Sequence, residues 1–162
     1  RWLHESFGTN WRMMEMQAVI GRIQLKRMPE WTARRREHAA KLAVTLGSFS
    51  CIRLPQIPEH IGHAQYKFYA FVRPEKLKDG WTRDGIIAEL NARGVPCYQG
   101  SCAEVYLEKA FDGTPWRPEG RLKNAVELGE TALMFLVHPT LTDSEIAFCR
   151  DHIAAVLRQA AR

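Results

Sequence analysis

The chain has 162 residues, of which 46% are hydrophobic and 25% charged, proportions typical of a globular domain that can fold without cross-links. Its net charge of +5 is a modest excess that suits an anionic ligand as well as nucleic acid. No apolar run reaches the ~20 residues of a membrane helix, and four cysteines without a C-x-x-C pair are typical of reduced thiols in a cytoplasmic protein. Because the chain starts at Arg1, without an initiator methionine or a signal-peptide pattern, we interpret it as part of something longer.

At the start of the chain, apolar residues occur at the spacing of an α-helix. Apolar residues recur three and four positions apart, which predicts a long amphipathic helix beginning near Met13. Met28-Pro29 predicts a break or kink, because proline cannot donate the next helical hydrogen bond. A second helical run over Glu30–Leu46 is expected to end near Gly47. Its Arg34-Arg35-Arg36 triplet would point in three directions on a helix, so we interpret it as a solvated or dimer-facing surface.

The rest of the chain predicts a small layered α/β unit. In order, its predicted elements are a strand at Cys51–Leu54, a strand at Gln65–Val72, a helix from Thr82 through Ala92, a short strand at Val95–Tyr98, helical turns at Glu104–Ala110, a helix at Leu122–Leu128, a strand at Ala132–Val137 and a last helix opened by a capping box at Thr142 and Glu145. Alternation places Tyr66 on the same strand face as Phe68 and Val72. His60 and His63 lack a third ligand nearby, so no metal site is predicted.

The stretch Phe7–Leu25, FGTNWRMMEMQAVIGRIQL, resembles the G-x-N-[YW]-R-M…Q-A-x-x-G-x-x-Q-L segment of the DegT/StrS-type (DegT/DnrJ) sugar aminotransferases, fold-type I enzymes that use pyridoxal phosphate (PLP). The matching residues are Gly8, Asn10, Arg12, Met13, Glu15, Gln17, Ala18, Gly21, Gln24 and Leu25. Trp11 stands where the family more often has tyrosine. The tail LMFLVHPTLTDSEI is similar to the family's closing segment, with Val137 in place of its usual proline.

The resemblance implies the fold class and the domain organisation. It implies α/β (α+β) architecture, the small C-terminal domain of a fold-type I aminotransferase, with a mixed, mainly antiparallel sheet, packed helices and a long N-terminal helix. Residues 1–48 would be the linker helices that join an absent large domain, and residues 49–162 the small domain. His138, beside Pro139, is interpreted as a structural histidine.

The same resemblance implies a function and its limits. The parent would transfer an amino group, with glutamate as the expected donor, to a nucleotide-linked keto sugar for polysaccharide or deoxyaminosugar synthesis, as a cytoplasmic homodimer. PLP would be bound mainly by the large domain. A transaminase needs a lysine that forms a Schiff base with its cofactor. None of the seven lysines lies in the family's motif for it, so this chain alone is expected to have no catalytic residue and no activity.

The resemblance also implies that a few residues contact the cofactor or the substrate at the border of the active site. Asn10 would contact the PLP phosphate of the neighbouring subunit. Arg12 could pair with a carboxylate at the dimer interface or with the substrate's phosphates. Tyr98, Ser101 and Glu104 would contact the substrate from the loop where the family has Pro-Leu-His. Because this loop reads Tyr98-Gln99-Gly100-Ser101-Cys102-Ala103-Glu104, a different sugar or a differently closed pocket is expected.

Three alternatives remain open at this point. A PLP-dependent sugar dehydratase of the same fold would have a histidine in place of the upstream lysine. A non-catalytic dimerisation or regulatory module would self-associate without any cofactor. A basic nucleic-acid binder rests only on the net charge and the arginine triplet, so neither nucleic acid nor membrane is expected as a partner.

Overall fold

The computed structural model describes residues 11–162, so Asn10 and the turn before it lie outside the described residues. Its strands form one four-stranded sheet in the order β1-β2-β4-β3, with every pair antiparallel. The strands are β1 (Ile52–Arg53), β2 (Phe68–Val72), β3 (Cys97–Tyr98) and β4 (Ala132–Phe135). The predicted α/β class with a long first helix is confirmed. Each strand is shorter than predicted, and Tyr66, predicted to lie in β2 beside Phe68, lies before the strand and is 72% exposed.

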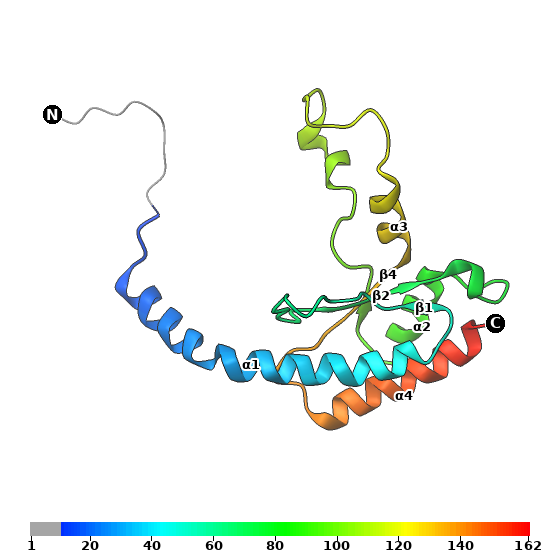
Figure 1. Ribbon diagram of the computed structural model, residues 1–162, viewed down its shortest axis with the longest axis horizontal. Coiled ribbons are helices and arrows are strands. Elements are labelled where there is room, and N and C mark those ends of the chain that lie inside the picture. Colours follow the sequence, from blue (N-terminus) through cyan, green and yellow to red (C-terminus); the bar gives the residue numbers. More distant parts are fainter. Residues whose placement is uncertain (1–10) are drawn as a thin grey trace.

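The first helix, α1 (Glu15–Gly47), is continuous and contains Pro29. Of the predicted break or kink at Met28-Pro29, the break is therefore wrong. A proline removes one helical hydrogen bond and crowds the preceding turn, and Figure 1 shows that α1 curves along its first half instead of ending. The helix starts two residues later than Met13, and the Gln17 side chain accepts a hydrogen bond from the Met14 N–H at 3.0 Å.

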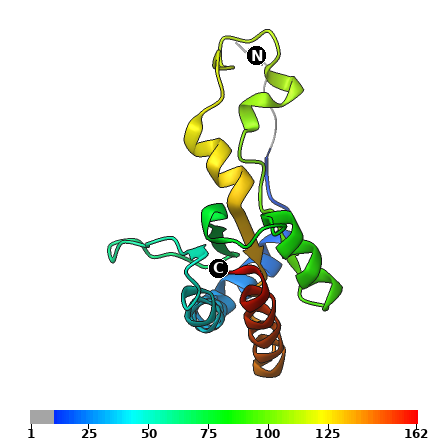
Figure 2. The same ribbon diagram turned by 90° about the vertical axis from the view of Figure 1, so that its right-hand side faces the viewer.

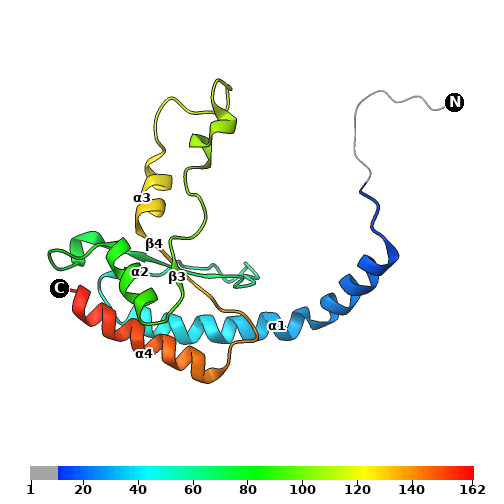
Figure 3. The same cartoon turned by 180° about the vertical axis from the view of Figure 1, so that it is seen from behind.

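The two halves of α1 differ in what they contact. In the second half His38, Ala39, Leu42 and Leu46 are buried and join the core. The first half, together with the two residues before it, carries large apolar side chains that are at least half exposed: Met13, Met14, Met16, Val19, Ile20 and Leu25. Figures 1 and 3 show this half extending away from the sheet. Whether residues 1–48 behave as a linker and residues 49–162 as a domain stays a prediction.

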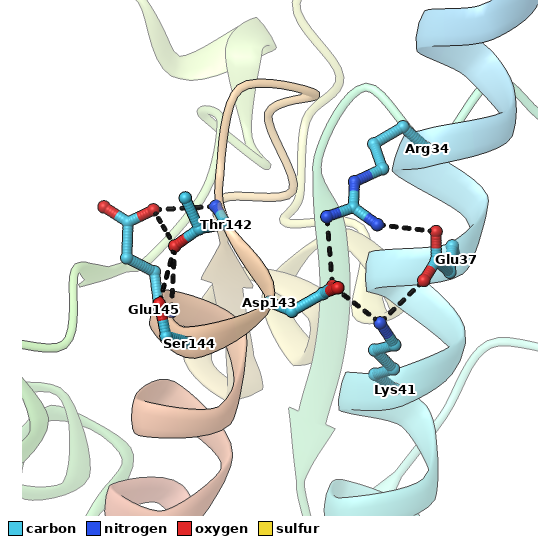
Figure 4. A network of polar contacts seen from close by, with 7 residues as sticks. All are labelled: Arg34, Glu37, Lys41, Thr142, Asp143, Ser144 and Glu145. Carbon is cyan, nitrogen blue, oxygen red and sulfur yellow. Dashed lines mark hydrogen bonds and ion pairs between the residues drawn. The ribbon is translucent and has the colours of Figure 1, made fainter.

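The last helix, α4 (Asp143–Ala160), lies along the second half of α1 and runs in the same direction (Figure 1). An ion-pair network joins the two helices (Figure 4). Asp143 accepts from Arg34 at 3.0 Å and from Lys41 at 2.8 Å, and both cations also pair with Glu37. Farther along, Arg150 donates to the Thr45 hydroxyl at 2.9 Å. Part of the arginine triplet thus serves an interhelical contact, which the expectation of a solvated or dimer-facing surface did not include.

This network predicts acid sensitivity. Hydrogen bonds from Lys41 and then the charge of Arg34 lower the pKa of Asp143, and the same two cations lower the pKa of Glu37. A carboxyl whose pKa is lower in the folded state stabilises the fold above about pH 4, and the contribution is lost as the pH falls through its folded pKa. Lys41→Met should therefore lower the thermal unfolding midpoint at neutral pH, and its gap from wild type should close in acid. Lys26→Met, on the exposed half of α1, is the control; a gap independent of pH would contradict the assignment.

The capping box of α4 is confirmed. The Thr142 hydroxyl accepts from the Glu145 N–H at 3.2 Å, and the Glu145 carboxylate accepts from the Thr142 N–H at 2.7 Å (Figure 4). Thr142→Ala should cost about 1 kcal/mol of unfolding free energy, measured by urea denaturation. Thr142→Ser should retain most of the wild-type stability, and Asp151→Ala, elsewhere on α4, should change little. Equal losses for the alanine and serine variants would show that the hydroxyl is not what matters.

Helix α2 (Arg83–Ala92) begins at Thr82, whose hydroxyl accepts from the Gly85 N–H at 3.0 Å. It ends before Gly94, which has a φ of 81° that favours glycine, as predicted. α2 packs on α4 and on strands β3 and β4, and Ile86 and Leu90 are buried there. The core therefore lies between the sheet and these helices.

The opposite side of the sheet carries a long excursion between β3 and β4 (Figures 1 and 2). It contains two short 3-10 turns, Val105–Leu107 and Lys109–Phe111, followed by α3 (Lys123–Thr131). α3 contacts β2, and Arg53 reaches across β2 to pair with Glu127 at 3.2 Å. No helix among residues 11–162 is long and apolar enough to cross a membrane.

Candidate functional site

Three side chains form a row across the open face of the sheet. The strand register sets Tyr98 opposite Met134 and Met134 opposite Tyr69, so all three project to the same side. Tyr98 is 48% exposed, whereas Met134, in the middle of the row, is buried. The Asn91 amide fixes β3 against α2, because it donates to the Cys97 carbonyl at 2.8 Å and accepts from the Cys97 N–H at 3.4 Å. The predicted substrate residue Tyr98 therefore sits on a firmly held strand.

The loop after β3 lies against the Tyr69 ring. Gly100 has a φ of 93°, and a Cβ placed there would come within 2.6 Å of the Tyr69 ring. Both facts require glycine at this position. Ser101 follows and lines a small hollow of about 280 Å³ together with Lys67 and Tyr69. The structure thus brings Tyr98 and Ser101, two of the predicted substrate residues, to one face.

Gly100→Ala tests this close approach. The added methyl group must adopt a backbone conformation that alanine disfavours and must also displace Tyr69, so we expect a loss of about 1–3 kcal/mol in unfolding free energy. Gly113→Ala shares the positive φ but has open space around its Cβ, and should show only the backbone part of the cost. Urea denaturation measures both; equal effects would contradict the packing of Gly100 on Tyr69.

Glu104 forms hydrogen bonds with other residues of the segment between β3 and β4. It accepts from Arg121 Nε at 2.9 Å and from the Tyr106 hydroxyl at 2.7 Å, and that hydroxyl in turn accepts from the Leu122 N–H at 2.8 Å. The Arg121 hydrogen bond, followed by that of Tyr106, lowers the pKa of Glu104 to about 2. The carboxylate is therefore ionised and holds the two ends of the excursion together. A substrate contact for Glu104 stays a prediction, and it would require sharing these donors.

Arg12 lies at the opposite extreme of the chain, just before α1. α1 begins three residues after Arg12 and rises about 1.5 Å per residue, so its first residue, Glu15, is about 36 Å along the helix from the buried Ala39. Figures 1 and 3 agree that the start of α1 is remote from β3. A single copy of the chain therefore does not bring Arg12 and Tyr98 together, and the roles of Arg12 and Asn10 stay predictions.

Further residues at this face were not predicted. Tyr69 was assigned correctly to the face of the strand opposite Phe68, but the register that sets it beside Tyr98 cannot be read from the sequence. Lys67 lies just before β2 and lines the small hollow with Tyr69. His63 and Gln65 come from the loop between β1 and β2, and Arg36 donates to the His63 carbonyl at 3.0 Å. No group of three metal-ligating side chains occurs within residues 11–162.

The hollow beside Tyr69 does not by itself have the groups that hold an aldehyde cofactor such as PLP. Such a site needs a lysine amine and an acidic group in one enclosure. No carboxylate lines the hollow beside Tyr69, and Lys41, in the ion-pair network, is bound between two carboxylates. Burial raises the pKa of the Cys97 thiol to about 12, so it is a neutral, structural side chain. The hollow beside Tyr69 is lined by Lys67 and lacks the acidic group of such a site.

The fold is an α/β domain with a four-stranded antiparallel sheet and helices packed on it. The chain belongs to the DegT/DnrJ/EryC1/StrS aminotransferase family, which it matches over residues 1–154.

Three proteins are similar to the chain in sequence or in fold. The chain is 31% identical over 141 residues to dTDP-3-amino-3,4,6-trideoxy-alpha-D-glucose transaminase of Streptomyces venezuelae, covering 87% of this chain and 35% of that protein. It superposes with a TM-score of 0.89 and 53% identity on the aminotransferase from Psychrobacter cryohalolentis, covering 98% of this chain and 42% of that one. An E. coli GDP-4-keto-6-deoxy-D-mannose-3-dehydratase with bound hydrated PLP shares the fold, with a TM-score of 0.73, 22% identity, and coverage of 90% and 36%.

These alignments also show how much of a relative the chain represents. It spans 35% of the length of the Streptomyces enzyme and 42% of the Psychrobacter one. The family is PLP-dependent.

Proposed function

We propose that the protein carrying this chain is a PLP-dependent transaminase that moves an amino group from glutamate onto a keto sugar attached to a nucleotide. The observation that carries the proposal is the family match over residues 1–154, strengthened by a sugar-nucleotide transaminase among the relatives. The product would serve polysaccharide or deoxyaminosugar synthesis in the cytoplasm. The cofactor would supply the electron sink for the transfer, and it would be held mainly by a larger domain.

In this proposal the chain contributes the edge of an active site. Tyr98 and Ser101 offer hydroxyl groups on the open face of the sheet, where a sugar can accept or donate hydrogen bonds. Asn10 and Arg12 would act at the far end of α1. Because one copy keeps Arg12 away from Tyr98, a homodimer in which the start of α1 reaches the neighbouring subunit supports both roles. Residues 1–48 would then be the linker and residues 49–162 the small domain.

The exposed apolar half of α1 fits this arrangement. Contiguous apolar surface of this kind is usually covered in the working protein. Packing against the large domain or a second subunit would cover it and would fix the position of Arg12.

A transfer assay tests the function. The whole protein, supplied with PLP, glutamate and a dTDP-linked keto sugar, should convert the sugar carbonyl to an amine and produce an equal amount of 2-oxoglutarate, both followed by mass spectrometry. Loss of water from the sugar without 2-oxoglutarate would replace the proposal with a dehydratase. A protein that self-associates but neither binds PLP nor changes the sugar would be a dimerisation or regulatory module.

A further inference from the structure

His38, in the second half of α1, is fully buried although its ring carries two polar nitrogens. Its exposed fraction is 0%, and neither Nδ1 nor Nε2 has a hydrogen-bond partner among residues 11–162. A buried polar atom without a partner costs free energy, so most such atoms in folded proteins are paired. An apolar side chain of similar size would fill the position without that cost. Packing alone therefore does not explain a histidine here.

The His38 ring lies where α1, the turn between β4 and α4, and the start of α4 meet. Arg34, one turn before it, and Glu37, directly before it, belong to the ion-pair network that reaches Asp143 of α4 (Figure 4). The backbone of His138, in the turn, lies against the ring but outside hydrogen-bonding geometry. We refer to this meeting place as the joint, which is made of residues 34–41, 136–141 and 143.

The charges at the joint already balance one another. Two cations, Arg34 and Lys41, come from α1, together with the carboxylate of Glu37. The carboxylate of Asp143 comes from α4, and each carboxylate binds both cations. A proton on His38 would add a third positive charge to two cations and two carboxylates. The network would then carry an excess positive charge in a buried place, which is unfavourable.

The other elements packed at the joint bring no further carboxylate. In the turn, the His138 side chain is exposed, and its Nδ1 shares a hydrogen bond with the Thr140 hydroxyl at 2.7 Å. Strand β4 and the two residues after it, Ala132–Val137, carry no titratable side chain. The buried His38 ring is therefore compatible with the neutral form alone.

The surroundings of His38 make the fold sensitive to mild acid. Burial, followed by the charge of Arg34, lowers the pKa of His38 below its usual value of 6.5. Glu37 and the His138 backbone act against this, and Lys41 acts with it. The unfolded chain thus binds a proton at His38 more readily than the folded chain does. Stability is full above about pH 6.5 and is lost as the pH falls toward the folded pKa, a range above that in which the carboxylates of the network titrate.

We propose that His38 is an acid-sensitive switch, in which proton uptake by the ring opens the joint and separates α4 and the turn from α1. The charged ring needs water or a carboxylate partner, and opening the joint gives it water. The second half of α1 packs on the core, whereas the first half is largely exposed. Opening the joint in mild acid would therefore uncouple the long first half of α1 from the sheet.

Urea denaturation at pH 7 and at pH 5 tests the switch. The equilibrium constant for unfolding of wild type should rise between these values, and His38→Leu should reduce that rise by about tenfold, because the proton taken up on unfolding is gone. His60→Leu, in the exposed loop between β1 and β2, is the control and should keep the wild-type rise. A His38→Leu variant that responds to pH as wild type does would overturn the proposal.

A second variant separates the charge of the ring from its polarity. His38→Gln keeps a buried polar group that takes up no proton between pH 7 and pH 5. It should be less stable than His38→Leu at both values, because its amide is buried without a partner, and it should share the weaker pH dependence. If His38→Gln keeps the wild-type pH dependence, the proton is not bound at His38 and the proposal fails.

Hydrogen exchange of the wild-type chain locates the opening and needs no variant. At pH 5 the amides of residues 34–46 and 143–150 should be at least about tenfold less protected than those of β2 and β4, which pair with each other in the sheet. Protection is compared after correction for the intrinsic exchange rate at that pH. Equal protection of the two sets at pH 5 would show that the chain opens only as a whole, and it would contradict a switch at the joint.

Discussion

Replacing Leu46 by alanine is expected to lower the free energy of unfolding by about 3 kcal/mol. Leu46 is fully buried near the end of α1 and belongs to the core that α1 shares with the sheet and α4. Its truncation removes buried apolar surface and leaves a cavity that the packed neighbours fill only in part. Equilibrium urea denaturation, followed by circular dichroism, measures the loss.

The matched control lies on the other half of the same helix. Ile20 is 53% exposed, so Ile20→Ala should change the free energy of unfolding by less than about 0.5 kcal/mol. Together the two variants test whether α1 is anchored by its second half alone. A loss at Ile20 as large as that at Leu46 would show that the first half is packed in solution, as it would be in a dimer.

Replacing Asn10 by alanine in the whole enzyme is expected to weaken retention of the cofactor by roughly 10- to 100-fold. The amide would donate a hydrogen bond to the cofactor's phosphate, and hydrogen bonds to a charged group are among the strongest that a neutral side chain makes. Dialysis followed by quantification of the released PLP measures the effect.

A control variant tests whether the loss of cofactor is specific to Asn10. Asn124→Ala, an exposed amide on α3, should retain the cofactor as wild type does. If Asn10→Ala also retains it, Asn10 has no role at the phosphate, and the resemblance of the stretch Phe7–Leu25 would reflect packing alone.

Much of the fold follows from local sequence rules. The capping box at Thr142, the cap at Thr82 and the stop at Gly94 each fix a helix end through neighbouring atoms, so a linear reading finds them. Pro29 shows where local rules fail. A break or kink was predicted from its missing N–H, yet the helix continues through Pro29, because the residues on both sides continue the helical ladder.

The site is harder to read because it depends on register and on backbone conformation. Tyr98 was predicted from its loop, but its neighbour Tyr69 becomes visible only when β4 pairs with both strands. Gln65 carries no sequence signal for a positive φ, since glutamine rarely adopts one. The partners of Glu104, Arg121 and Tyr106, could not be assigned to it from spacing, and its predicted substrate contact stays a prediction.

The most direct test of the central claim is an absorbance spectrum of the whole protein with PLP, before and after the addition of glutamate. A transaminase should show a visible band of bound cofactor that diminishes when glutamate is added, because the amino group passes to the cofactor. A band that glutamate leaves unchanged, or a protein that binds no PLP, would contradict the account.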